Sequence, residues 1–156
     1  LEEVAEYWHQ VVKINDYQKN RFAQKIIDHF GGDLTGKKIT VLGWAFKENT
    51  NDSRESPAIY VAEKLFKAGA IIEIYDPMVS KEFIFRDIDF YWEASKTEDL
   101  KAQISVLDSI DTLDPKIDAT AILTEWEVFK NLDFSKTVVF DGRGVLSSSR
   151  YSIGKG

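Results

Sequence analysis

The sequence contains no cysteine among its 156 residues. That absence excludes disulfide bonds, metal sites built from thiolates, and any mechanism in which this chain supplies a cysteine nucleophile. Histidine is almost as scarce, since only His9 and His29 are present, and neither has a second histidine or a cysteine at metal-ligand spacing. No Ser-His-Asp arrangement is recognisable either. We therefore predict no metal site and no catalytic residue in this chain.

The sequence also lacks a long apolar run and an excess of positive charge. Its longest mainly apolar run, residues 39–46, is far too short to span a bilayer, and no charged-then-apolar leader precedes it. Lys and Arg number 20 against 26 Asp and Glu, and the resulting net charge of −6 argues against a nucleic-acid partner. We expect a cytoplasmic, soluble globule in which a few local cations hold any bound anion.

Strand patterns alternate with helix patterns along most of the chain. The predicted strands cover residues 38–43, 71–75, 104–107, 119–123 and 137–141. The predicted helices cover residues 2–30, 57–68 and 125–131, with a helical turn at 110–113. Leu1 already lies inside the first helical pattern, so we expect a piece of a longer protein. The alternation predicts an α/β fold, with a parallel sheet flanked by helices and preceded by a long helix.

Two segments fit this pattern poorly. Residues 78–103 are mixed and charged, and we interpret them as a partly helical insertion. Its expected anchors are Phe83, Ile84, Phe90, Tyr91 and Trp92. The segment 151–153 looks like a last strand, but only nine residues separate it from Asp141, fewer than the dozen that a parallel crossover needs. Either this segment does not pair in parallel or residues are missing between Leu146 and Arg150, and we favour missing residues.

The carboxyl edge of the predicted sheet gathers the residues that could bind a ligand, because loops and helix N-termini converge there. Its cations are Lys47 and Arg54 in the loop after the first strand and Arg143 after the fifth. Three positive charges on one edge of an acidic protein suggest a phosphate-bearing ligand, since an arginine can bind two oxygens at once.

The loop after Gly43 resembles a dinucleotide-binding turn only in its first residue. The Gly-x-Gly-x-x-Gly fingerprint lets the backbone approach a pyrophosphate, but Ala45 and Glu48 occupy the second and third glycine positions here. The loop runs for about a dozen residues before the helix N-cap at Ser56, where two to six are usual. Asp76, where such folds keep a ribose-binding acid, is a hint without support. We interpret the loop as functional but not as a standard dinucleotide site.

Each cation also has a purely structural interpretation. Lys47 by itself is typical of a solvated surface lysine. Arg54 could brace the loop by pairing with Asp52 or Glu55. The stretch 141–144, Asp-Gly-Arg-Gly, could be only a turn, in which Asp accepts backbone hydrogen bonds and Gly supplies a positive φ. The sequence leaves these alternatives open.

Five motifs match a known signature in identity and in order. They are Asn15-Asp16-Tyr17-Gln18, Gly43-x-x-Phe46-Lys47-x-x-Thr50-x-Asp52-x-Arg54-x-Ser56-Pro57, Tyr75-Asp76-Pro77, Leu123-Thr124-Glu125-Trp126 and Phe140-Asp141-Gly142-Arg143. Together they span nearly the whole chain and resemble the C-terminal part of the UDP-glucose/GDP-mannose dehydrogenase family. The resemblance implies a Rossmann-like, UDP-sugar-binding domain over residues 31–156. It also implies that residues 1–30 are the end of a central helical dimerisation region.

The resemblance implies a role for each residue of this edge. Enzymes of the family oxidise UDP-glucose to UDP-glucuronate with two NAD, using a cysteine upstream of the matched part. By position, Phe46, Lys47 and Arg143 are implied to contact the UDP-sugar, and Arg54 to reach an NAD that another domain mainly binds. The isolated chain is therefore expected to be inactive, with no membrane partner. The full enzyme is implied to be a homo-oligomer.

The chain departs from the family in length. It is shorter between Leu132 and Val138, and residues 147–149 replace a family helix, in agreement with the crossover problem above. Two other hypotheses stay open. One is a free-standing nucleotide-binding or regulatory domain that lost the chemistry. The other is an oligomerisation module, in which residues 1–30 pair between subunits and the sheet only supports them.

Overall fold

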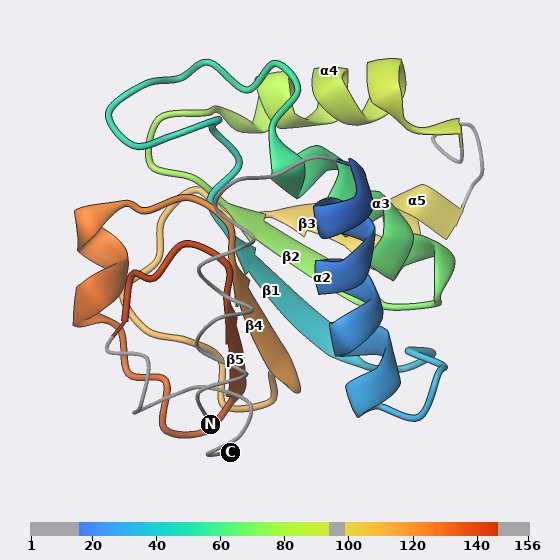
Figure 1. The fold of residues 1–156 in the computed structure, drawn as a ribbon. Helices are drawn as coiled ribbons and strands as arrows, with labels where there is room; N and C mark the ends of the chain where they lie inside the picture. The colour runs from blue at the N-terminus through green and yellow to red at the C-terminus, as the bar shows by residue number, and fades with distance from the viewer. Residues whose placement is uncertain (1–15, 94–98, 147–156) are drawn as a thin grey trace.

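Five strands of the described residues form one parallel sheet, which confirms the predicted α/β class. The computed structural model describes residues 16–93 and 99–146 (Figure 1). The strands are β1 (Lys38–Leu42), β2 (Ile71–Tyr75), β3 (Ile104–Val106), β4 (Ala119–Ile122) and β5 (Val138–Asp141). Their order across the sheet is β3-β2-β1-β4-β5, and every neighbouring pair is parallel. The connections leave β1 and β4 in opposite directions, which makes the gap between them a topological switch point.

The helices cover both faces of the sheet. They are α2 (Asp16–His29), α3 (Pro57–Lys67), α4 (Lys81–Tyr91), α5 (Asp99–Gln103) and the 3₁₀ helix η2 (Glu127–Asn131). Because parallel crossovers are right-handed, connections that run in opposite directions across the sheet lie on opposite faces. Figure 1 accordingly shows α3 on one side of the sheet and η2 on the other. None of the described helices combines the length and the apolar character that a bilayer span requires.

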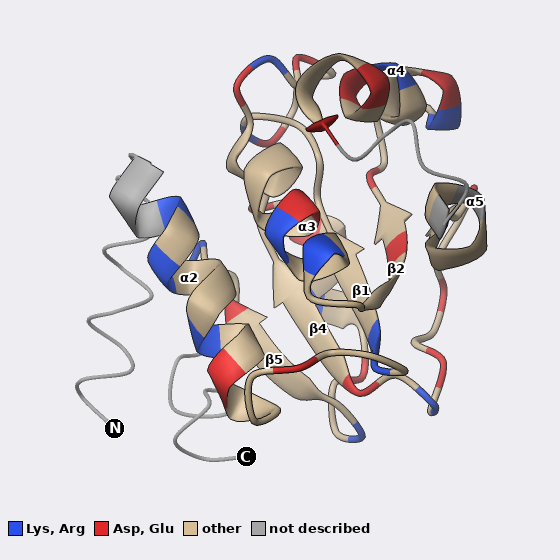
Figure 2. Cartoon of the chain, turned by 90° about the vertical axis from the view of Figure 1, so that its right-hand side faces the viewer, with Lys and Arg blue, Asp and Glu red and all other residues tan. Residues whose placement is uncertain are grey.

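Helix α3 begins and ends where its sequence predicts. The Ser56 hydroxyl caps the first turn by accepting a hydrogen bond from the Ala58 amide at 3.3 Å, and Pro57 occupies the first helical position. The chain leaves the helix at Gly69, whose φ of 103° suits glycine. The predicted apolar stripe of α3 is buried. Helix α2 packs along α3 (Figure 2), and the two helices share one core with the sheet. The buried residues of the two helices include Ile59, Ala62, Leu65 and Phe66 from α3 and Phe22, Ala23, Ile26 and Ile27 from α2.

The strand register brings four strands to one level at the carboxyl edge. Leu42 of β1 pairs with Tyr75 on one side and with Ile122 on the other, and Ile122 pairs with Asp141 of β5. The segments that follow these strands therefore start side by side. These segments are the long loop (residues 43–56), Asp76-Pro77, residues 123–126 and residues 142–146.

The structure corrects four of the sequence predictions. The supposed insertion is the ordinary crossover from β2 to β3, and α4 faces the core through Ile84 and Ile88. Phe83 and Phe90 are therefore not anchors, since 48% and 79% of their surface is exposed, whereas Trp92 is buried as expected. No helical turn forms at 110–113, and the helix expected at 125–131 is the shorter η2.

Some predictions lie outside the described residues. They concern the helical pattern before Asp16, the family helix position at 147–149 and the segment 151–153.

Candidate functional site

A single buried carboxylate, Asp76, ties three of the edge segments together. It is 6% exposed and accepts five N–H donors. The donors to Oδ2 are the Trp44 and Ala45 amides at 2.7 and 2.8 Å and the Trp126 indole at 3.1 Å, and those to Oδ1 are the Met78 and Val79 amides at 2.8 and 3.0 Å. Since a carboxylate offers about four lone-pair sites, Asp76 is saturated by the protein. It organises the edge and is not placed to hold a ribose hydroxyl.

Gly43, the first residue of the long loop, is needed for close packing. Gly43 has a φ of 100°, and a Cβ there would lie 2.4 Å from the Thr124 side chain. The Thr124 hydroxyl donates to the Ala45 carbonyl at 2.8 Å, so the loop lies directly against the segment after β4. The first turn of α3 is already capped by Ser56 and begins with Pro57, which has no amide proton. These residues do not fit the pyrophosphate of a dinucleotide such as NAD, which agrees with the missing fingerprint.

The long loop is held at its base, and its tip projects. The amide of Phe46 donates to the Asp52 carbonyl at 2.7 Å and closes the neck of the loop. On the β2 side, Asp87 of α4 accepts hydrogen bonds from the Trp44 indole at 2.9 Å and from the Ser53 hydroxyl. Residues 47–51 form the tip, where Asn49 has a φ of 62°. The loop is thus a fixed structure despite its length.

Arg143 lies across the switch point and holds the other side of the long loop. Only 9% of its side chain is exposed. Its Nε donates to the Leu123 carbonyl at 3.0 Å, its Nη2 donates to the Phe46 carbonyl, and its Nη1 lies 3.4 Å from the Glu125 carboxylate. Burial lowers the pKa of the guanidinium, and the negative charge of Glu125 partly offsets that effect. Glu125 also accepts the Glu48 amide at 3.0 Å.

The turn that carries Arg143 has the geometry expected of Asp-Gly-Arg-Gly. Asp141 accepts backbone hydrogen bonds from Arg143, Val145 and Leu146, and Gly144 has a φ of 68°. The structural interpretation of the stretch is therefore correct, but it is incomplete. The same turn aims the arginine at the long loop.

The four residues predicted from the sequence fall into two groups. Arg143 meets Phe46, and Lys47 follows Phe46 directly, so these three lie together at the switch point. Phe46 is 49% exposed, and the exposed Lys47 ammonium makes no hydrogen bond or ion pair with any described residue. Arg54 lies at the far end of the loop, 85% exposed, and pairs with both oxygens of Asp52. The loop-brace alternative for Arg54 is confirmed with Asp52 as the partner.

Two residues of the candidate site escaped the sequence reasoning in different ways. Glu125 belongs to the segment that directly follows β4, so its place at the edge was available from the sequence, although its pairing with Arg143 was not. Asp87 lies within α4, 43 residues after Trp44, and no spacing rule connects the two. Its contacts are a product of the tertiary fold.

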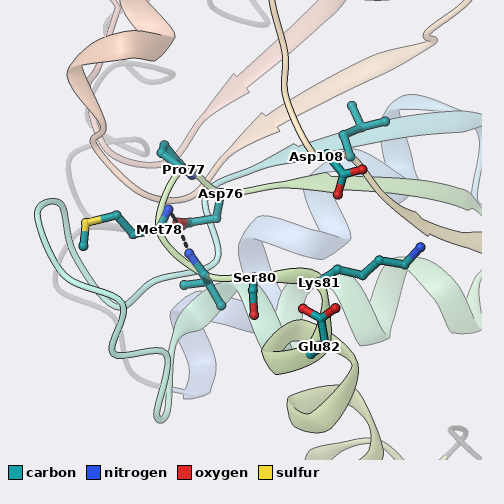
Figure 3. Close-up of a pocket in the computed structure, with 9 residues that line it drawn as sticks. Asp76, Pro77, Met78, Ser80, Lys81, Glu82 and Asp108 are labelled. Atoms are coloured by element: carbon teal, nitrogen blue, oxygen red, sulfur yellow. Dashed lines mark hydrogen bonds between the residues drawn. The ribbon is translucent and has the colours of Figure 1, made fainter.

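The other side of the edge is hollowed. A cavity of about 280 Å³ opens between the end of β2, the start of α4 and the residues after β3, and we call it the α4 cavity. Figure 3 shows Lys81 and Glu82 on the first turn of α4, with Asp108 across from them. Its charged side chains are mainly acidic, which does not suit a phosphate. Among the residues that the structure describes, no group of His, Cys, Asp and Glu could hold a metal ion.

A parallel sheet with a fixed loop and a buried arginine at its switch point defines a nucleotide-binding α/β domain. Comparison with known proteins narrows this class. The sequence profile of the UDP-glucose/GDP-mannose dehydrogenase family, UDP binding domain, matches residues 40–148. The chain belongs to this family, as its five motifs indicate.

Curated relatives match the chain along its whole length. UDP-glucose 6-dehydrogenase 1 of Arabidopsis thaliana is 40% identical over 180 residues, covering 99% of this chain and 37% of the relative. UDP-glucose 6-dehydrogenase 4 of Oryza sativa subsp. japonica is 40% identical over 179 residues, with the same coverage. The chain thus spans well under half the length of these relatives. The first alignment is 24 positions longer than the 156 residues of this chain, so that relative has additional residues within the aligned part.

Solved structures agree with the fold. A UDP-glucose dehydrogenase from the hyperthermophilic archaeon Pyrobaculum islandicum superposes with a TM-score of 0.61 at 28% identity, over 86% of this chain and 28% of that one. The UDP-N-acetyl-mannosamine dehydrogenase Cap5O from S. aureus superposes with a TM-score of 0.52 at 26% identity, over 87% and 29% of the two chains.

Proposed function

We propose that this chain is the UDP-sugar-binding part of an NAD-dependent UDP-glucose 6-dehydrogenase, which oxidises UDP-glucose to UDP-glucuronate. The observation that carries the proposal is the convergence of Phe46, Lys47 and Arg143 at the switch point. Arg143 bonds the backbone carbonyl of Phe46, whose side chain is exposed, and the cationic Lys47 is the next residue, on a protein that is acidic as a whole. Cations suit a diphosphate, and an aromatic ring offers an apolar surface to a base or a sugar.

The choice of UDP-glucose rests on the curated relatives. Those that are 40% identical along the whole chain carry UDP-glucose 6-dehydrogenase in their names. The two solved structures have names that share UDP but differ in the sugar. UDP is therefore the better supported half of the ligand, and the sugar is chosen from the closer sequence similarity.

We assign no step of the oxidation to this chain. It has no cysteine, and its loop does not fit a dinucleotide pyrophosphate. NAD, which accepts the hydrides in such a reaction, would be held mainly by a part of the enzyme outside this chain. Arg54 is proposed to contact NAD from across the cleft, because its side chain is 85% exposed on the loop that also carries the substrate contacts.

The wider setting is also part of the proposal. Residues 1–30, which include all of α2, are proposed to end a helical region through which the full enzyme forms a homo-oligomer. Residues 31–156 are proposed to be the binding domain. The full enzyme is proposed to act in the cytoplasm.

A calorimetric titration of the 156-residue chain with UDP, UDP-glucose and NAD tests the proposal. In the proposed enzyme, this chain forms only one side of a cleft between two domains. The isolated chain should therefore bind its ligand weakly, because contacts from the other domain are absent. We expect millimolar binding of UDP and UDP-glucose, weakened at higher salt, and none of NAD. Arg143→Lys keeps the charge but loses the two-oxygen fork, so it should bind UDP more weakly. Binding of NAD without UDP would contradict the proposal.

The rival hypotheses predict different outcomes. If the chain is an oligomerisation module, replacing both Lys47 and Arg143 would leave its oligomeric mass in solution unchanged. Such a module would also show no UDP binding before or after the replacement. A free-standing regulatory domain would bind UDP, but its gene would encode nothing upstream of Leu1. The proposed dehydrogenase instead requires an upstream reading frame with a catalytic cysteine.

A further inference from the structure

The guanidinium of Arg143 is already engaged by three acceptors of the protein. Two of them are backbone carbonyls, Leu123 at 3.0 Å from Nε and Phe46 beside Nη2. The third is the carboxylate of Glu125, 3.4 Å from Nη1. With 9% of its side chain exposed, Arg143 is not an open cation that waits for a ligand. A phosphate that binds there must reach a guanidinium with few N–H groups left.

The three acceptors are unequal. The Leu123 carbonyl directly follows buried strand β4, and the Phe46 carbonyl belongs to the closed neck of the long loop, so neither can move without changing the backbone. The Glu125 side chain is 30% exposed and makes the longest of the three contacts. A side chain can rotate into solvent at low cost. Glu125 is therefore the acceptor that an incoming group can most easily replace.

Charge supports the same conclusion. A buried cation that loses its only counter-ion is strongly destabilised. Glu125 provides that counter-ion among the described residues, with Oε2 3.4 Å from Nη1 of Arg143 while Oε1 accepts the Glu48 amide. A diphosphate that took the place of Glu125 would keep the guanidinium neutralised, whereas an uncharged ligand would not.

We propose, resting on the UDP-binding function above, that Glu125 competes with the ligand's phosphate for Arg143 and is displaced when UDP binds. Because the same carboxylate accepts the Glu48 amide, its displacement also releases the tip of the long loop next to Lys47. Glu125 thus sets the affinity for phosphate-bearing ligands and couples their binding to the position of the loop tip.

Two matched substitutions in the 156-residue chain test this competition. Glu125→Gln keeps the shape and can still accept the Glu48 amide, but it removes the charge at Arg143. Glu127→Gln removes the same charge two residues away, where Glu127 is exposed and pairs only with Lys130 among the described residues. Calorimetry with UDP should show binding about fivefold tighter for Glu125→Gln than for Glu127→Gln. Uridine, which has no phosphate, should not distinguish the two variants.

The outcomes separate this inference from the proposed function. Equal UDP affinities for the two variants, or weaker binding by Glu125→Gln, would overturn the competition and make Glu125 a residue that orients Arg143. UDP binding by the wild-type chain would still uphold the proposed function in that case. If no form of the chain binds UDP, the proposed function fails and this inference fails with it.

A second measurement covers the case in which Glu125→Gln does not fold. In the wild-type chain, the proton signal of the Glu48 amide reports its hydrogen bond to the Glu125 carboxylate. Saturating UDP should move this signal, since the acceptor leaves. A Glu48 signal that stays in place while the signals of Phe46 and Lys47 move would contradict displacement.

Discussion

The two sides of the carboxyl edge differ in charge although the same sheet builds them. Between β1 and β4, Arg143 and Lys47 accompany a loop that is fixed by hydrogen bonds from both sides. Between β2 and β3, the α4 cavity has a volume of about 280 Å³, but it is lined by Asp108 and Glu82. Cavity volume alone would favour the α4 side. The position of the switch point and the sign of the charge favour the other side as the phosphate site.

The residue that joins the two sides should show the largest effect. Replacing Asp76 with Ala leaves five N–H groups without their acceptor, and we expect a loss of about 4 kcal/mol in the free energy of unfolding. Asp108→Ala, in the α4 cavity, removes an exposed carboxylate and should change it by less than about 0.5 kcal/mol. Urea denaturation of both variants measures the difference. Similar midpoints would show that Asp76 does not hold the edge together.

Gly43 gives the next largest effect, because the switch point needs a close approach there. Gly43→Ala places a Cβ 2.4 Å from Thr124 at a φ of 100°, and we expect a loss of about 3 kcal/mol. Gly31→Ala is the control, since its φ is 82° but no atom lies within 4 Å of the added Cβ, and it should cost about 1 kcal/mol. The same denaturation experiment measures both. Equal losses of stability would mean that position 43 requires glycine because of backbone strain and not because of close contact with Thr124.

Two exposed lysines allow a direct comparison of the two sides. Lys47 lies at the switch point and Lys81 at the α4 cavity, and neither ammonium pairs with a described residue. Lys47→Ala should weaken UDP binding about fivefold, or roughly 1 kcal/mol, the upper end for a solvent-exposed ion pair, while Lys81→Ala leaves it unchanged. Calorimetry at one fixed salt concentration measures both. A larger effect of Lys81→Ala would move the binding site to the α4 cavity.

The smallest expected effect is the pH dependence of stability that comes from the Asp52–Arg54 ion pair at the far end of the long loop. The hydrogen bonds from Arg54 hold the pKa of Asp52 below its ordinary value of 3.8. Since the pKa of Asp52 is lower in the folded protein than in the unfolded chain, the pair stabilises the folded state above pH 3.8. This contribution is lost as the pH falls through the pKa of the folded state. The pair is solvent-exposed, so the effect is small. Urea midpoints should therefore differ between the wild-type chain and Asp52→Asn at pH 6 and converge in acid. A constant difference would contradict this.

The sheet could be predicted because its strands are short apolar runs bounded by turn residues. Ser56-Pro57 and Gly69 likewise fixed the ends of α3 from local chemistry alone. The errors arose where tertiary packing decides. Phe83 and Phe90 look like core residues in sequence, but α4 buries Ile84 and Ile88 and leaves the two aromatic residues exposed.

The site was only partly predictable for the same reason. The edge that carries Lys47 and Arg143 follows from strand order, and the motifs indicated the family. The contacts of Arg143 with Glu125 and with the Phe46 carbonyl join residues 18 and 97 positions apart. No local pattern encodes such contacts, so the arginine's engagement by its own protein became visible only in the fold.

Mapping of UDP onto the backbone amides by NMR tests the central claim most directly. We predict that the amide signals of residues 46–48, 125 and 143 move together as UDP is added, while those of residues 78–82 and 108 stay in place. Movement confined to the residues of the α4 cavity, with the long loop unaffected, would contradict the assignment of the switch point as the phosphate site.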